Sequence, residues 1–444
     1  MDKIAEEVID YALFHKAYGA EVFLENTTEK TTIYDTSQGE KVKCDFEQGI
    51  GIRLFFKNHY MYLSFNELNK NGILSKLKQL ITNRDKNQNI NIFHFFGNMF
   101  NPDLVMMEEP CILPILNEEV ESYHKQLKFL RIRVKTIQEK KEIQILNSNN
   151  ILKSKKLGHT KVYANLFNEN KITSKGLVNI RGTKLDRLNI NQSIEKAIKQ
   201  SLLTDMKKET LVAENYPVIV GNGSGGILLH EICGHPLELR AVVHEKSFLR
   251  NTLNTKITSD KVTIIDDPLL EVGWGSNLID DEGTDTTPTF LLENGIVKNF
   301  LCDQFNGSMS NFNTNGAARR ESYRYPPTSR MSNTYLLPGE DKAEELINEV
   351  KMGVYIKELT EGGIDVVTGD FRVGIKEAYM IEKGKITKPI ANRLVIGNAN
   401  EALQHLEKIA DDLSFSNHFC RAVSGRIPVS VGQPTVKYKS LNIR

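Results

Sequence analysis

The 444-residue sequence contains few of the residues that would place it in several large classes of protein. Its 5 cysteines are an odd number and lie far apart, which argues against a disulfide framework and for a reducing compartment. They are Cys44, Cys111, Cys233, Cys302 and Cys420. No apolar run approaches the ~20 residues that span a bilayer, and no signal peptide is visible, so we expect a cytoplasmic protein with no membrane contact.

The chain also lacks an excess of charge of either sign. Its 57 basic and 56 acidic residues give a formal net charge of +1. No basic stretch alternates with aromatic residues, as binders of single-stranded nucleic acid require. We therefore expect no direct contact with nucleic acid. What remains is the composition of a globular protein, with 40% hydrophobic and 25% charged residues.

The length exceeds what one ordinary hydrophobic core supports, and the pattern of the sequence changes near residue 210. We predict an α+β fold with two domains, at residues 1–210 and 211–444. The N-terminal domain is expected to be of α/β type, with an antiparallel sheet and long helices. The C-terminal domain is expected to be β-rich and to carry the helix of the motif described below.

Hydrophobic periodicity places individual elements within these domains. Helices are predicted at Glu118–Lys141, Ile190–Lys208, Lys342–Val350 and Ala399–Ile409. Short strands are predicted throughout, among them Glu21–Leu24, Thr31–Tyr34, Ile50–Phe56, Val262–Asp266, Thr289–Glu293 and Asp365–Thr368.

The most informative segment is GGILLHEICGHPLE, in which His230, Glu231 and His235 form an HExxxH pattern. Two imidazoles are standard ligands of a divalent transition metal, and a general base is expected beside the first of them. In HExxH enzymes the two histidines are four residues apart, on one face of an α-helix. Five residues rotate the side chains by roughly 140°, too far for one metal. A π-type turn would bring them together, with Gly234 as the point of distortion. A buried, hydrogen-bonded histidine pair remains the alternative.

A catalytic zinc site needs a third protein ligand. Cys420 lies in a polar, turn-rich segment from which a thiolate can reach inward, and zinc accepts thiolates. Cys233 and Cys302 are predicted to be small core residues. His244 and His418 remain open as substitutes for Cys420.

Several blocks of the second half resemble the TldD/PmbA family of zinc metallopeptidases, in its TldD-like branch that bears the motif. The segment GGILLHEICGHPLE is similar to the family's Gly-x-Leu-Leu-His-Glu-x-x-Gly-His-x-x-Glu. Further similar blocks are Asp280–Thr284, Asn315–Gly316, Arg319–Tyr323, Arg330–Met331, Glu377–Tyr379 and Pro428–Pro434. The first half resembles the family only loosely.

The resemblance implies a zinc ion, its ligands and a catalytic base. The implied ligands are His230, His235 and Cys420, and the implied base is Glu231. One departure concerns the residues after the cysteine. The family usually has Gly and then Lys there, whereas this chain has Arg421 and Ala422.

The family's activity implies a peptidase that cleaves unfolded or small, sometimes modified, peptides. Zinc would activate a water molecule to attack the peptide carbonyl, with Glu231 as general base. A peptide could add as a strand to an exposed sheet edge. Relatives of this kind form dimers, either with a related PmbA-like subunit or with themselves, so we expect a dimer.

Two other functions remain open. The chain could hydrolyse another amide, or it could be a non-catalytic interaction protein, like a gyrase modulator, with a structural metal. The roles of two charged blocks also stay open. Asp280, Asp281 and Glu282 could orient a metal ligand or form a capped turn. Arg319 and Arg320 could bind a peptide carboxylate or form structural ion pairs.

Overall fold

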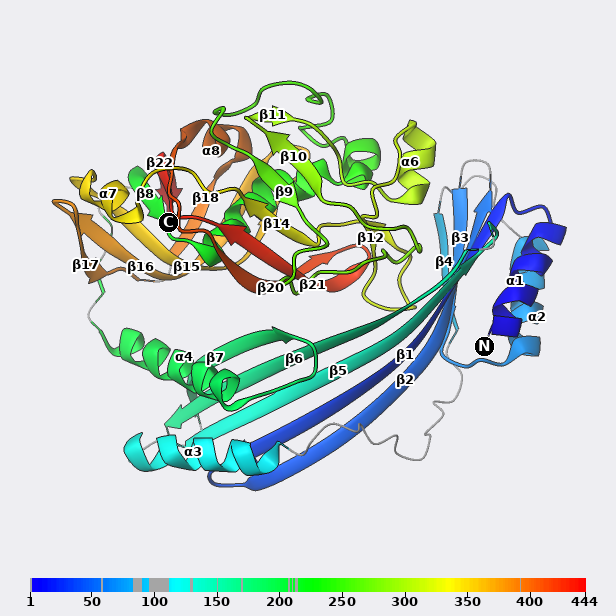
Figure 1. Ribbon diagram of the computed structural model, residues 1–444, viewed down its shortest axis with the longest axis horizontal. Coiled ribbons are helices and arrows are strands. Elements are labelled where there is room, and N and C mark those ends of the chain that lie inside the picture. Colours follow the sequence, from blue (N-terminus) through cyan, green and yellow to red (C-terminus); the bar gives the residue numbers. More distant parts are fainter. Residues whose placement is uncertain are drawn as a thin grey trace.

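The computed structural model contains a long, curved sheet built from the first half of the chain, beside a second half rich in short strands (Figure 1). It describes residues 2–56, 59–82, 90–95, 112–127, 131–149, 151–168, 171–206, 208–209, 211, 215–391 and 393–444. The predicted boundary at residue 210 and Cys111 lie outside the described residues, so the boundary stays a prediction. The α+β class is confirmed.

The first sheet has the strand order β4-β3-β2-β1-β5-β6-β7. Its strands are β1 (Gly19–Asp35), β2 (Gly39–Phe56), β3 (His59–Phe65), β4 (Ile90–Phe95), β5 (Arg131–Asn147), β6 (Leu152–Asn168) and β7 (Lys171–Arg181). Neighbours pair antiparallel except β3 and β4, which are parallel. The two strands predicted at Glu21–Leu24 and Thr31–Tyr34 are parts of the single strand β1, which pairs with β2 without interruption from Gly19 to Asp35.

Helices cover the two ends of this sheet. α1 (Asp2–Phe14) and α2 (Lys70–Thr82) pack on β1, β2 and β3, while α3 (Leu113–Leu127) and α4 (Arg187–Asp205) pack on β5, β6 and β7. Among the described residues, no helix combines the length and the apolar character needed to cross a membrane.

The helix predicted over Glu118–Lys141 is wrong in its second part. α3 ends at Leu127, and Arg131–Lys141 belongs to β5. From Arg131 onward, buried residues such as Ile132 and Val134 alternate with half-buried ones, which is the period of a strand. The alternation is hard to see in the sequence, because the buried positions after Val134 hold the polar residues Thr136 and Gln138, and the apolar Ile137 lies between them.

The second half forms two larger sheets and a small one. The six-stranded sheet has the order β11-β10-β9-β14-β21-β20. The other large sheet closes on itself, because its strands β15 and β16 also pair with each other. The strands of the first are β9 (Ile264–Asp266), β10 (Thr289–Glu293), β11 (Ile296–Val297), β14 (Asn333–Leu336), β20 (Ser414–Ala422) and β21 (Gly425–Gln433). Those of the second are β8 (Asn215–Val220), β15 (Met352–Ile364), β16 (Asp370–Glu382), β17 (Lys385–Pro389), β18 (Arg393–Asn398), β19 (Leu406–Ile409) and β22 (Val436–Ile443). The small sheet pairs β12 (Ala318–Arg319) with β13 (Thr328–Ser329).

Helices in this half are short. They are α5 (Gly226–Leu229), α6 (Gln304–Ser310), α7 (Ala343–Asn348) and α8 (Ala399–His405). The helix predicted at Ala399–Ile409 is therefore correct only up to His405, since the last four residues form β19. The strand predicted at Asp365–Thr368 is wrong. This segment is the turn between β15 and β16, because the Asp365 carboxylate accepts hydrogen bonds from the Val367 and Thr368 backbone.

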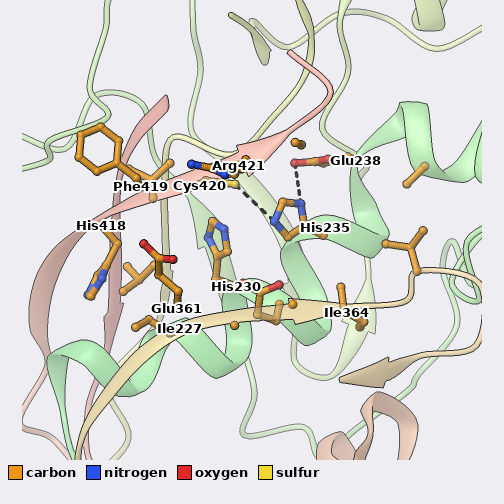
Figure 2. A pocket seen from close by; sticks show the side chains of 18 of the residues that line it. Ile227, His230, His235, Glu238, Glu361, Ile364, His418, Phe419, Cys420 and Arg421 are labelled. Carbon is orange, nitrogen blue, oxygen red and sulfur yellow. Dashed lines mark hydrogen bonds and ion pairs between the residues drawn. The ribbon is translucent and has the colours of Figure 1, made fainter. Parts of the chain in front are cut away.

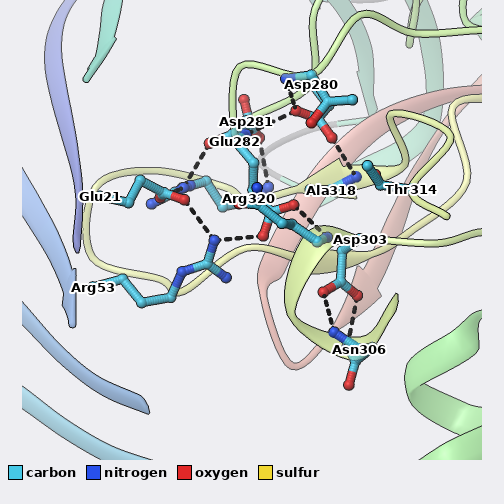
Figure 3. A network of polar contacts seen from close by, with 12 residues as sticks. Glu21, Arg53, Asp280, Asp281, Glu282, Asp303, Asn306, Thr314, Ala318 and Arg320 are labelled. Carbon is cyan, nitrogen blue, oxygen red and sulfur yellow. Dashed lines mark hydrogen bonds and ion pairs between the residues drawn. The ribbon is translucent and has the colours of Figure 1, made fainter. Parts of the chain in front are cut away.

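A network of buried charges joins the first sheet to the second half (Figure 3). Arg53 on β2 is fully buried and contacts two carboxylates, that of Glu21 at 2.5 Å and that of Glu282. Arg320 also contacts Glu21, at 2.5 Å. On β1, Glu21 alternates with Val22, which faces the core under α1 and α2. One face of β1 therefore packs against α1 and α2, and the other face binds the second half of the chain.

We expect Arg53→Met to lower the free energy of unfolding by about 3–5 kcal/mol, because it removes the counter-charge of buried Glu282 and leaves buried Glu21 with Arg320 alone. Urea denaturation measures the loss. Arg187→Met is the control, because Arg187 pairs with Glu118 and Glu119 at the surface, and it should cost far less. Equal losses in the two variants would contradict a special role for the buried network.

Candidate metal centre

The HExxxH segment follows β8 and changes helix type within a few residues. A 3-10 turn, η1 (Gly223–Gly225), leads into α5, then a π turn, η2 (His230–Gly234), and a second 3-10 turn, η3 (His235–Leu237). In η2 the backbone N–H of His235 donates to the carbonyl of His230, five residues earlier. The predicted π-type turn is therefore confirmed, and it brings the two imidazole centroids within 5.0 Å.

Glycine is needed at position 234 for packing, whereas the sequence predicted it as the point where the helix is distorted. Its backbone angles, φ −63° and ψ −63°, are ordinary for a right-handed helix. A Cβ at this position would instead overlap the sulfur of Met331, which is fully buried. The glycine is thus required by the close packing of the turn against its neighbour, because the interior has no space to move Met331 aside.

Cys420 reaches the same place from β20, an edge strand in the described part of its sheet. Its sulfur lies 3.3 Å from Nε2 of His235. His230, His235 and Cys420 each offer one possible ligand atom, and these three atoms lie within 4.8 Å of one another. The structure therefore brings together the three residues that the sequence nominated as ligands.

The other residues weighed as ligands are not part of this cluster of three. His244 contacts the Asn306 side chain at 2.8 Å, and His418 contacts Ser416 at 2.8 Å on the wall of the cleft. Cys233 and Cys302 are buried in the main core of this half, which confirms their prediction as core residues.

A second layer of contacts holds two of the three side chains. Nδ1 of His235 lies 3.2 Å from a carboxylate oxygen of Glu238. Arg330 is fully buried, and its Nε lies 3.8 Å from the same oxygen. Its guanidinium also donates to the Cys420 carbonyl at 2.9 Å, the Ser424 hydroxyl at 2.8 Å and the Gly425 carbonyl at 3.1 Å. Sequence reasoning found no role for Glu238 or Arg330. The position of Glu238, three residues after His235, was the available signal.

Electrostatics in the centre favour a thiolate. Burial would raise the pKa of the Cys420 thiol, but the positive charges of His235, Arg330 and His230 outweigh it and hold that pKa well below its ordinary value. Burial would lower the pKa of His235, but Cys420 and Glu238 raise it well above its ordinary value. Burial raises the pKa of the Glu231 carboxyl, an effect that the two imidazoles oppose.

These residues fit a zinc ion. Two imidazole nitrogens and one thiolate are a donor set that zinc accepts in catalytic sites, which retain an open fourth position. Nδ1 of His230 is buried and has no hydrogen-bond partner among the described residues. Zinc affinity for such a site also depends on the groups that orient its ligands, here Glu238 on His235.

The side chains of His230, His235 and Cys420 line one cleft (Figure 2). Glu231 lines the same cleft, which has a volume of about 500 Å³. The cleft runs between β20 on one wall and the end of β15 on the other. At Gly362 on β15, a Cβ would lie 3.1 Å from Cγ of Glu231, so the glycine leaves room for the carboxylate side chain.

The two charged blocks whose roles the sequence left open, 280–282 and 319–320, make structural contacts. Asp280 caps a turn by accepting hydrogen bonds from the backbone of Glu282 and Thr284, and Asp281 pairs with Lys155 at 2.6 Å. Arg319 donates to the carbonyls of Met331 and Pro428, and Arg320 belongs to the buried network. These contacts correspond to the capped turn and the structural ion pairs.

Comparison with known proteins agrees with this geometry. The family model described as the PmbA/TldA metallopeptidase C-terminal domain matches residues 213–444. The chain belongs to the PmbA/TldD family. A metalloprotease TldD homolog of Buchnera aphidicola subsp. Schizaphis graminum is 36% identical over 251 residues, 56% of this chain and 52% of that protein. A zinc metalloprotease TldD homolog of Saccharolobus solfataricus is 32% identical over 263 residues, 59% of this chain and 58% of that protein.

These alignments cover only part of the relatives, which limits the properties that can be inferred for this PmbA/TldD chain. The chain spans about half the length of the curated relatives it matches here. A crystal structure of a protein from Thermotoga maritima, titled as a modulator of a DNA gyrase, superposes with a TM-score of 0.74 at 18% identity and covers 100% of both chains. That likeness shows the fold alone.

We expect Gly234→Ala to lower the free energy of unfolding by about 1–3 kcal/mol, because the new methyl group overpacks a filled site. Combining it with Met331→Ala should cost less than the sum of the two single changes, because the second change makes room for the first. Denaturant titrations of the four proteins measure the coupling. Strict additivity would show that Gly234 is needed for another reason.

We expect Arg330→Lys to weaken zinc binding roughly 10- to 100-fold, because a lysine cannot hold the Cys420 hairpin and face Glu238 together. Competition with a chromogenic chelator measures the affinity, and the thiolate-to-metal absorption of the cobalt-loaded protein reports the sulfur ligand. Arg319→Lys is the matched control, since Arg319 is also buried but contacts neither Cys420 nor Glu238. Equal weakening in both variants would contradict a specific role for Arg330.

Proposed function

We propose that this chain is a zinc-dependent peptidase that cleaves small or unfolded peptides. The observation that carries the proposal is the meeting of His230, His235 and Cys420 in one cleft that Glu231 also lines. The relatives are named as metalloproteases, which supports the same conclusion. A purely structural zinc site would be closed by four protein ligands.

The residues of the chain divide the chemical work. When bound, zinc supplies a Lewis acid that polarises a peptide carbonyl and acidifies a water molecule. Glu231 would take a proton from a water molecule in the cleft and later pass it to the leaving amine. Glu238 holds the His235 imidazole in one orientation, and Arg330 holds the hairpin that presents Cys420.

The strand next to the cleft supports a peptide as the substrate. In the described part of its sheet β20 has a neighbour, β21, on one side only. A peptide in an extended conformation can add to such an edge through main-chain hydrogen bonds, which carry little sequence preference. Part of this edge is already used, because Nδ2 of Asn179 donates to the Asn417 carbonyl at 2.9 Å. Toward Cys420 the strand lines the cleft, where the reaction would take place.

Assembly is a further part of the proposal. The cleft is open to the surface, and a PmbA-like subunit or a second copy of this chain would complete its outer wall. The resemblance to dimeric relatives supports this arrangement. Analytical ultracentrifugation of the zinc-loaded protein, alone and with a related subunit, distinguishes the two assemblies.

We expect Glu231→Gln to keep zinc but to lower kcat for peptide cleavage by about 10²- to 10⁴-fold, because the amide cannot take the proton from water. Metal analysis and a peptide-cleavage assay measure the two properties. Glu361→Gln, which changes another carboxylate that lines the cleft, should stay within about tenfold of the parent. Full activity of Glu231→Gln would exclude this mechanism and favour an interaction protein with a structural metal.

A further inference from the structure

The hairpin that carries Cys420 also carries two arginines at the rim of the cleft. β20 and β21 pair antiparallel, and the register places Arg421 directly opposite Arg426. Both side chains are exposed, and both residues line the cleft. Figure 2 shows Arg421 beside Cys420. Like charges directly opposite on neighbouring strands destabilise a sheet, so this pair has an energetic cost in the free protein.

Neither arginine is neutralised by the chain. Among the described residues, no carboxylate oxygen lies within 4.0 Å of the Arg421 or the Arg426 guanidinium, whereas Arg240 in the same cleft pairs with Glu245. The carboxylate of Glu321 is close to the hairpin, but it accepts the backbone N–H of Arg426 at 2.7 Å. The two guanidinium groups are thus free to bind an anion from solution.

A third cation lies next to the pair. The Arg426 guanidinium stacks 3.7 Å from the ring centre of Phe419, and Nζ of Lys161 lies 4.9 Å from the same centre. Burial lowers the pKa of Lys161, and the charge of Arg426 lowers it further, against the pull of Glu139 and Glu29. Phe419 and Arg426 also line a second cavity of about 420 Å³, between the hairpin and the first sheet. The positive charge therefore lies where the two cavities meet.

We infer that Arg421 and Arg426 form an anion subsite that binds a carboxylate of the peptide substrate on one side of the bond to be cleaved. The carboxylate is either the free C-terminus or an Asp or Glu side chain. A guanidinium fork binds a carboxylate through two parallel hydrogen bonds, and stacking on Phe419 holds one fork in place before binding. The bound anion would also relieve the repulsion across the hairpin. This inference rests on the proposed peptidase function.

The test compares peptides of one sequence that differ in a single charge. One set ends in a carboxylate or in an amide, and a second set, amidated throughout, has Glu or Gln at each position near the cleaved bond. The parent protein should cleave one carboxylate-bearing peptide with a kcat/KM about tenfold above its neutral partner. The set that shows the difference identifies the source of the carboxylate.

The variants assign that preference to the two arginines. Arg421→Gln with Arg426→Gln should abolish it, and Arg421→Glu with Arg426→Glu should reverse it in favour of the neutral partner peptide. Arg372→Gln combined with Arg250→Gln is the matched control, because both residues are exposed, the two changes remove the same two charges, and neither residue lines the cleft. A preference that persists in the double glutamine variant, or that is absent in the parent protein, would overturn the inference.

A binding measurement separates this inference from the proposed function. Zinc-loaded Glu231→Gln protein is mixed with fluorescent versions of the same peptides, and anisotropy gives the affinity at low and high salt. Tighter binding of the carboxylate peptide, weakened by salt and lost in the double glutamine variant, would support the subsite even if no peptide were cleaved. Equal binding of both peptides would refute the subsite. It would not contradict the proposed peptidase function.

Discussion

The metal centre depends on one fully buried guanidinium, that of Arg330. The Cys420 sulfur must meet an imidazole 185 residues earlier in the chain. Arg330 fixes this meeting because it donates to three acceptors in the β20–β21 hairpin and faces Glu238, which contacts His235. A buried charge without these acceptors would cost several kcal/mol, so the hairpin and the imidazole are held in a single arrangement.

The first sheet takes part in that arrangement, although it contributes no ligand. Residues 319–324 lie between the hairpin and the first sheet and bind both. Glu321 accepts the backbone N–H of Arg426, while Arg320 pairs with Glu21 and Tyr323 packs with Phe23. The positions of His230, His235 and Cys420 are therefore set by contacts from both halves of the chain, while the rim of the same hairpin is exposed.

Local geometry could be predicted from the sequence, and distant contacts could not. The spacing of His230 and His235 requires a π turn, because only that turn points both rings to one side. Cys420 was nominated firmly only through the family resemblance, since spacing cannot locate a ligand so far away. Arg330 was missed because a side chain that binds backbone carbonyls leaves no residue pattern in its partners. The predicted helix over Glu118–Lys141 extends too far because the polar residues Thr136 and Gln138 occupy buried positions after Val134 and break the apolar alternation.

The buried charges on β1 also limit how the gene can gain or lose codons. Side chains alternate along a strand, so one residue added or removed between Gly19 and Glu21 would turn Glu21 toward the helices and present Val22 to Arg320. The far tip of the same hairpin, from Asp35 to Gly39, has no such partner across the two halves among the described residues. Length differences among homologous chains should therefore accumulate at this tip, while the central span of the strand keeps a constant number of residues.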